Sequence, residues 1–189
     1  MITSSPAAAR ASRAIERIGR LLRERENEAG LNPAQWEALR CLSLANRFSR
    51  SPSAVAAWLA TTRGTASQTL IALERKGLVA RAADPRDKRG SRLELTVAGQ
   101  GILDSDPLAS VAETIAGLPP LHTVALGQSL AQILDDLLGA SSRPGFHACA
   151  GCRNFAVVAG GSGEGRCGRF DAVVATDEAT RACIAHEAA

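Results

Sequence analysis

SPSAVAAWLATTRGTASQTLIALERKGLVARAADPRDKRGSRLELTVAG, residues 51–99, is the stretch of sequence that decides the fold. Its first part predicts two short helices separated by a tight turn. The first helix begins at Ser51-Pro52, because serine caps a helix start and proline suits its first turn. Thr62 is the expected cap of the second helix, which runs over residues 63–76. Two helices at this spacing form a helix-turn-helix.

A charged hairpin follows the second helix. Residues 78–81 and 91–95 are strand candidates, and in the second of them leucines alternate with Arg92 and Glu94, as in a half-buried strand. Residues 84–90, DPRDKRG, form the expected tip of the hairpin. A helix-turn-helix followed by a basic hairpin predicts a winged helix.

This layout has a direct use in DNA binding. The second helix fits the major groove, where side chains near its start reach base edges. Basic side chains on a wing reach phosphates or the minor groove. The sequence therefore predicts a binding site for double-stranded DNA formed by Arg63, Thr65, Ser67, Gln68, Arg86, Lys88 and Arg89.

Helices are predicted on both sides of the winged helix. An amphipathic helix covers residues 10–29, and Asn32-Pro33 begins another. Thr96 is the expected cap of a helical stretch with a break near Asp106-Pro107, and a final long helix covers 121–138. The expected fold class is mainly α with a small β wing.

Composition and charge agree with a DNA-binding role. The chain has 189 residues, of which 46% are apolar, and a net charge of +3, which excludes disordered and fibrous classes. Residues 48–96 hold nine basic and four acidic side chains, whereas residues 97–140 hold five acidic and no basic ones. A basic block beside an acidic one predicts a face for a polyanion. No apolar run approaches the roughly 20 residues of a membrane helix, and no signal peptide is evident, so we expect a cytoplasmic protein.

The winged-helix stretch resembles the MarR family of bacterial transcription regulators. The resemblance is carried by the ordered set LERKGLVAR (73–81), DPRDKR (84–89) and LTVAG (95–99), and it extends over about residues 10–140. It implies a homodimer held by the first and last helices of this region, a pseudo-palindromic DNA site, and repression lifted by a ligand or an oxidant. By the same resemblance, residues 63–68 would read bases and residues 86–89 would form the wing.

A second unit is expected over residues 141–189, after a domain covering 1–140. Four of the five cysteines lie there in the pattern C-x2-C-x14-C-x15-C, and a cytosolic cluster of this kind favours a metal site over disulfides. Residues 141–189 contain too few large apolar side chains to form a stable core without a cross-link or a bound metal. The predicted metal ligands are Cys149, Cys152, Cys167 and Cys183. Thr176 is expected to cap a last helix that places Cys183 and His186 on one face.

The cysteine spacing is similar to that of the high-potential iron–sulfur proteins, which hold a [4Fe-4S] cluster. The matching segments are CAGC (149–152), GRCGRF (165–170) and ACIA (182–185). The resemblance implies an iron–sulfur cluster, and a [2Fe-2S] form stays open. Zinc is the alternative, although zinc sites more often pair two C-x2-C knuckles. His147 or His186 is a possible replacement for one cysteine.

The sequence thus predicts a dimeric DNA-binding regulator, of repressor type, whose C-terminal cysteine centre senses redox, oxygen or iron status. A regulator with structural zinc that responds to a small molecule is the first alternative. An electron-transfer protein with a vestigial winged helix is the second. The sequence offers no nucleophile–base pair, catalytic dyad or phosphate-binding loop, so we expect no enzyme. Cys41 lies among leucines and is expected to be a buried core thiol.

Overall fold

The computed structural model describes residues 5–28, 30–84, 87–140, 145–158 and 164–189, with the side chains of residues 84 and 87–90 outside the description. The described helices are α1 (Pro6–Glu28), α2 (Pro33–Leu44), α3 (Pro52–Trp58), α4 (Arg63–Arg75), α5 (Val97–Leu103), α6 (Pro107–Ala116), α7 (Pro120–Ala140) and α8 (Thr176–Ala179). The described strands are β1 (Val79–Asp84), β2 (Asp87–Leu95), β3 (Phe155–Val157), β4 (Gly165–Cys167) and β5 (Ala172–Val174).

Side chains with local partners start the helices where the sequence predicts. Asn32 and Gln35 form a reciprocal capping box at α2. Ser51 accepts a hydrogen bond from Ala54 N–H at the start of α3, and Thr62 accepts one from Thr65 N–H at the start of α4. The predicted starts of these three helices are confirmed. The predicted caps at Thr96 and the break before Pro107 are confirmed as well, since Thr96 caps α5 and Asp106 caps α6.

A single apolar core joins α2 to the winged helix. Trp36, Leu39 and Leu42 on α2 are almost completely buried, and Cys41 lies among them with 0% exposure. They pack against residues of α3, α4 and the wing, namely Val55, Leu70, Leu73, Leu78, Val79 and Leu93. The prediction that Cys41 is a core thiol is therefore confirmed.

The wing is an antiparallel pair of strands, β1 and β2, in which Val79 pairs with Leu95 and Ala83 pairs with Ser91. Both strands are longer than predicted, because β1 continues to Asp84 and β2 already begins at Asp87, within the segment expected to form the tip. The chain enters β1 through Gly77, which adopts a φ of +69° after α4. Gly99 allows α5 to pack closely on this turn, since a Cβ there would lie 2.0 Å from the carbonyl oxygen of Leu78.

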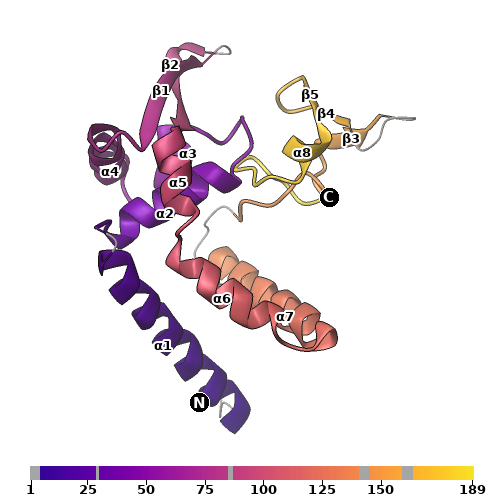
Figure 1. The fold of residues 1–189 in the computed structure, drawn as a ribbon. Helices are drawn as coiled ribbons and strands as arrows, with labels where there is room; N and C mark the ends of the chain where they lie inside the picture. Colours follow the sequence, from indigo (N-terminus) through magenta and orange to yellow (C-terminus); the bar gives the residue numbers. More distant parts are fainter. Residues whose placement is uncertain (1–4, 29, 85–86, 141–144, 159–163) are drawn as a thin grey trace.

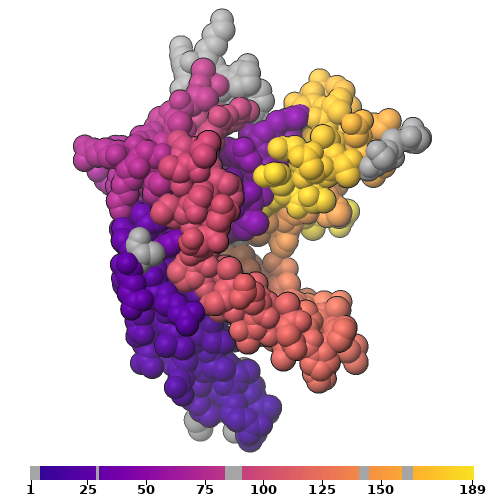
Figure 2. Space-filling view, viewed as in Figure 1, coloured from indigo at the N-terminus to yellow at the C-terminus, as the bar shows by residue number. Residues whose placement is uncertain are grey.

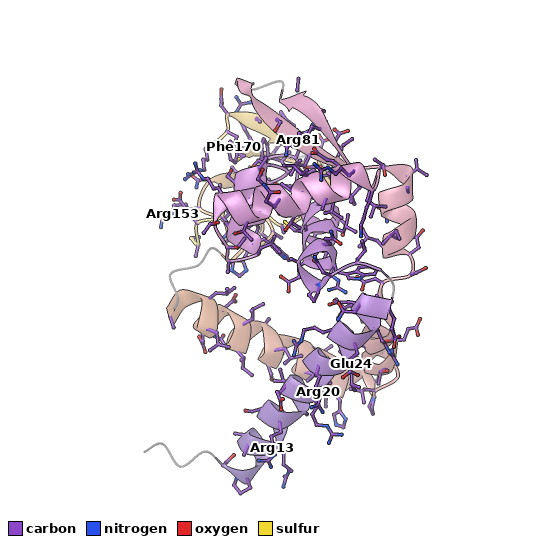
Figure 3. The ribbon with its side chains drawn as sticks, turned by 90° about the vertical axis from the view of Figure 1, so that its left-hand side faces the viewer. Arg13, Arg20, Glu24, Arg81, Arg153 and Phe170 are labelled. Atoms are coloured by element: carbon purple, nitrogen blue, oxygen red, sulfur yellow. The ribbon has the colours of Figure 1, made fainter. Side chains whose placement is uncertain are left out.

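Three helices extend from this core as two arms. Figure 1 shows α1 running away on one side and the α6–α7 hairpin on the other. Most apolar side chains on these arms are exposed, including Leu121 at 78% and Leu137 at 64%, and α7 buries none of its residues. Figure 3 shows Arg13, Arg20 and Glu24 along α1. None of the described helices is long and apolar enough to span a lipid bilayer.

An ion-pair triad fixes the arms to the core. The Arg40 guanidinium on α2 lies 2.6 Å from Glu26 on α1 and 2.5 Å from Asp106 at the start of α6. All three side chains are at most 15% exposed. Burial alone would raise the pKa of Asp106, but hydrogen bonds from Arg40 and from the Leu108 N–H bring that pKa below its usual value.

The C-terminal segment folds into a small three-stranded sheet in the order β3-β4-β5, followed by α8. We call residues 145–158 and 164–189 the cysteine module. Figures 1 and 2 show it beside the winged helix, on the side away from α4. It contacts the loop that joins α2 to α3, where Ala45 and Ala182 form a parallel bridge.

Two expectations for this segment are wrong. Ala175, and not Thr176, precedes α8, and no side chain caps that helix. Because α8 ends at Ala179, Cys183 and His186 do not share a helix face. Cys183 instead forms an isolated bridge with His147.

Candidate functional site

The start of α4 presents the predicted base-reading residues. Arg63, Thr65 and Gln68 are exposed, and Ser67 is half-buried. The opposite face of the helix is anchored in the core by Ala66, Leu70 and Leu73, all fully buried. The Thr65 hydroxyl lies 3.0 Å from that of Thr62 and is therefore part of the helix cap as well as of the exposed face. The helix thus offers a solvated first turn on a rigid support.

The wing residues are placed only in part. Lys88 and Arg89 lie in β2, but their side chains, and the whole of Arg86, fall outside the described residues. Arg81, on β1, is a further basic residue on the wing that sequence analysis did not select. It lies 2.5 Å from Glu74 on α4 and so links the wing to that helix.

The four cysteines of the module converge although they come from three segments. Cys149 and Cys152 lie in one turn, Cys167 in β4, and Cys183 in the bridge to His147. Three of them are 6–8% exposed and Cys152 is half-buried, and none forms a disulfide. Burial, and then the nearby Cys183, Cys167 and Cys152, raise the pKa of the Cys149 thiol to about 11.

The convergence does not amount to a formed ligand set. Within the described ranges, no group of three or more His, Cys, Asp or Glu side chains is arranged closely enough to hold a metal ion. The two histidines that were alternatives lie together, with ring centroids 5.0 Å apart. Burial, and then the neighbouring His147, lowers the pKa of His186.

The surroundings of the cysteines fit a sulfur-rich centre. Phe48, Phe155 and Phe170 pack in the same cluster as Cys149 and Cys167. Asn154, two residues after Cys152, has a buried Nδ2 atom without a hydrogen-bond partner. The same is true of Asn46, in the loop that joins α2 to α3.

The module and the winged helix meet along a seam with direct contacts. The rings of Phe48 and Phe170 stack at 4.4 Å and 5°, and those of Trp58 and Phe146 meet edge to face at 4.9 Å. A cavity of about 540 Å³ lies in this seam, with Trp58 and Phe146 on its wall and Arg181 from the module. Sequence analysis missed Phe48, although an aromatic residue between two predicted helices was a signal of a contact.

The helix-turn-helix, the wing and the solvated start of α4 define a winged-helix DNA-binding protein. Residues 29–90 match the model of the MarR family. A MarR-family transcriptional regulator from Silicibacter pomeroyi is 28% identical over 69% of this chain and 89% of that chain, with a TM-score of 0.55. The winged-helix region is therefore similar to that of MarR-family transcriptional regulators.

Other solved structures share the fold. The S. aureus MepR–DNA complex is 19% identical over 71% of this chain and 99% of that one, with a TM-score of 0.54. NadR in complex with 4-hydroxyphenylacetate is 20% identical over 70% and 95% of the two chains, with a TM-score of 0.56. No curated protein matches the chain.

Proposed function

We propose that this protein is a homodimeric repressor that binds a pseudo-palindromic DNA site through the first turn of α4 and the wing. The observation that carries the proposal is the exposed, capped start of α4, with Arg63 and Gln68 turned to solvent on a helix fixed by its other face. Arginine and glutamine are side chains that pair with guanine and adenine edges in the major groove.

The arms supply the surface for a second copy. Ile15, Ile18 and Leu21 on α1 are 43–57% exposed, and the apolar side chains of α7 are exposed along most of its length. Contiguous exposed apolar faces on helices commonly mark surfaces for association with another protein. A two-fold dimer would present two α4 helices and would match the symmetry of a pseudo-palindromic site.

We further propose that Cys149, Cys152, Cys167 and Cys183 hold one metal centre, an iron–sulfur cluster of the [4Fe-4S] or [2Fe-2S] type. Three buried thiols and three phenylalanine rings packed near them support this assignment over zinc, because apolar shielding tunes clusters. When bound, a cluster supplies a one-electron change and sensitivity to oxygen. The chain's cysteines would then make DNA binding depend on redox, oxygen or iron status.

DNA binding is tested by selecting duplexes from a random library and titrating the selected site with variants. Arg63→Ala and Gln68→Ala should each weaken binding to that site by about 1–3 kcal/mol and relax its sequence preference. Arg86→Ala with Arg89→Ala should weaken binding to all duplexes and reduce the salt slope by about 2. Arg13→Ala, on the far part of α1 (Figure 3), is the matched control. Equal affinities for all four proteins would remove α4 and the wing from the proposal.

The metal centre is tested on protein purified without oxygen. A brown protein with charge-transfer absorption and matching iron and sulfide content is the expected result. A colourless protein with stoichiometric zinc would replace the cluster by the structural-zinc alternative. Single Cys→Ala changes at the four positions should each abolish the metal, whereas Cys41→Ala should retain it. Full metal content in the Cys167→Ala or Cys183→Ala variant would refute the four-cysteine site, and His147 and His186 would be tested next.

A further inference from the structure

The core of the cysteine module is completed by the winged helix. Phe48, in the loop between α2 and α3, is 7% exposed and packs in one cluster with Cys149, Cys167 and Val174. Its ring stacks on Phe170, and the Arg47 guanidinium lies 4.8 Å from the centre of the Phe48 ring on the loop itself. Phe48 therefore forms part of the apolar surroundings of Cys149 and Cys167, although it lies more than 100 positions before them in the sequence.

Backbone hydrogen bonds hold the same loop to the chain around Cys183. Ala182 N–H donates to Leu44 C=O, and Asn46 N–H donates to Ala182 C=O, both at 2.9 Å. One residue beyond Cys183, Ile184 N–H donates to the Ser49 hydroxyl at 2.9 Å. Cys183 therefore sits between two residues that are tied directly to the loop.

The loop is equally tied to the parts that bind DNA. Arg50 C=O accepts a hydrogen bond of 2.8 Å from Leu93 N–H on the wing strand β2, and the next residue, Ser51, caps α3. Trp58, at the end of α3, contacts Phe146 of the module. A displacement of residues 44–50 would therefore reach both α3 and the base of the wing.

We infer that residues 44–50 are the coupling surface between the cysteine centre and the helix-turn-helix, and that the coupling acts within one protomer. The inference rests on the proposed function. When the centre is filled, the Cys183 turn is fixed and Phe48 and Ser49 are held. When it is empty, the cysteine module loses the metal that stabilises it. Residues 44–50 then lose their contacts with the chain around Cys183, and these contacts position α3 and the wing. This route differs from one through the dimer arms, to which the described module is joined by the half-exposed His147–Asp135 pair at 3.4 Å.

Hydrogen exchange on the full chain, with the metal bound and after its removal by a chelator, tests the inference without a DNA readout. Removal of the metal should raise exchange of the amides of Asn46, Arg47, Ala182 and Ile184 by about tenfold or more, since these four amides donate hydrogen bonds across the seam. The amides of α7 should not change. A response in α7 without one in residues 44–50 would overturn the inference.

Variants of Phe48 connect the loop to DNA affinity. In the wild type, metal removal should change the affinity for the selected duplex by about 5-fold to 150-fold. Phe48→Ala should bind metal at the wild-type stoichiometry and bind DNA with a metal-dependence of less than about twofold. Phe48→Leu, which keeps an apolar side chain, should restore part of the dependence. Val157→Ala, an exposed position on the same module, is the control and should keep all of it.

The outcomes separate the inference from the proposed function. If Phe48→Ala loses metal or fails to fold, the comparison passes to Ser49→Ala, which removes the bond to Ile184 N–H and leaves the Phe48–Phe170 stack in place. A variant that holds metal and keeps the full metal-dependence of DNA binding overturns the coupling alone. A wild type that binds no metal overturns the proposed centre and the coupling together.

Discussion

Arg40 offers a prediction whose magnitude follows from the structure. Its guanidinium compensates two carboxylates, Glu26 and Asp106, whose side chains are 5% and 13% exposed. Arg40→Met keeps most of the side-chain volume and removes the charge. Two buried acidic groups then lose their partner, which costs about 3–5 kcal/mol of unfolding free energy. In a chain of this length that loss corresponds to a fall in Tm of about 6–20 °C.

Thermal unfolding at one fixed protomer concentration measures the effect, because dimerisation makes Tm depend on concentration. Adding Glu26→Gln and Asp106→Asn to Arg40→Met should recover most of the loss, since the uncompensated charges are then gone. Arg81→Met is the control, because the Arg81–Glu74 pair is more exposed and is expected to contribute about 0–1 kcal/mol. Equal Tm shifts for Arg40→Met and Arg81→Met would refute the reasoning.

The same triad makes stability depend on acidic pH. The pKa of Asp106 is lowered in the folded state, so its contribution is complete above the unfolded value of about 3.9 and is lost as the pH falls through the lowered value. In Arg40→Met the burial of Asp106 remains while its main partner is absent, so burial raises the pKa of Asp106 and protonation relieves the uncompensated charge. The difference in unfolding free energy between the wild type and Arg40→Met should therefore shrink as the pH falls. Urea unfolding between pH 3 and pH 7 measures this difference, and identical profiles would contradict it.

Three further predictions concern the winged helix. Burial raises the pKa of Cys41 to about 12, so its thiol should resist iodoacetamide at pH 8 in the folded protein and react only after denaturation; rapid labelling of the native state would contradict this. Thr62→Ala removes the cap of α4 and should lower the unfolding free energy by about 1 kcal/mol, whereas Thr62→Ser should not change it. Gly99→Ala places a Cβ against Leu78 C=O and should cost about 1–3 kcal/mol in urea unfolding, while Gly101→Ala, which has open space, should be neutral or stabilising.

The helices and the wing could be predicted from sequence because their signals are local. Asn32, Ser51, Thr62 and Thr96 each find a partner three residues ahead, so a short window contains both the cap and the helix that it starts. The short α8 has no such cap, so the predicted cap at Thr176 was wrong, although a helix does start at that residue.

The contacts that connect distant segments could not be predicted in this way. Nothing in the neighbourhood of Phe48 indicates that its partner is Phe170, and nothing near Arg40 indicates both Glu26 and Asp106. The cysteine spacing indicated a shared centre, which stays a prediction, but it gave no sign of the loop around Phe48 that packs against Cys149 and Cys167. Which metal the four cysteines hold stays a prediction, since spacing alone suits both zinc and an iron–sulfur cluster.

The most direct test of the account is the affinity of the full chain for its selected duplex, measured in the metal-loaded and the metal-free state at one salt concentration. We expect two protomers per duplex and a Kd that differs between the states by at least about fivefold. The same Kd in both states, from protein shown to have bound and then lost its metal, would contradict it.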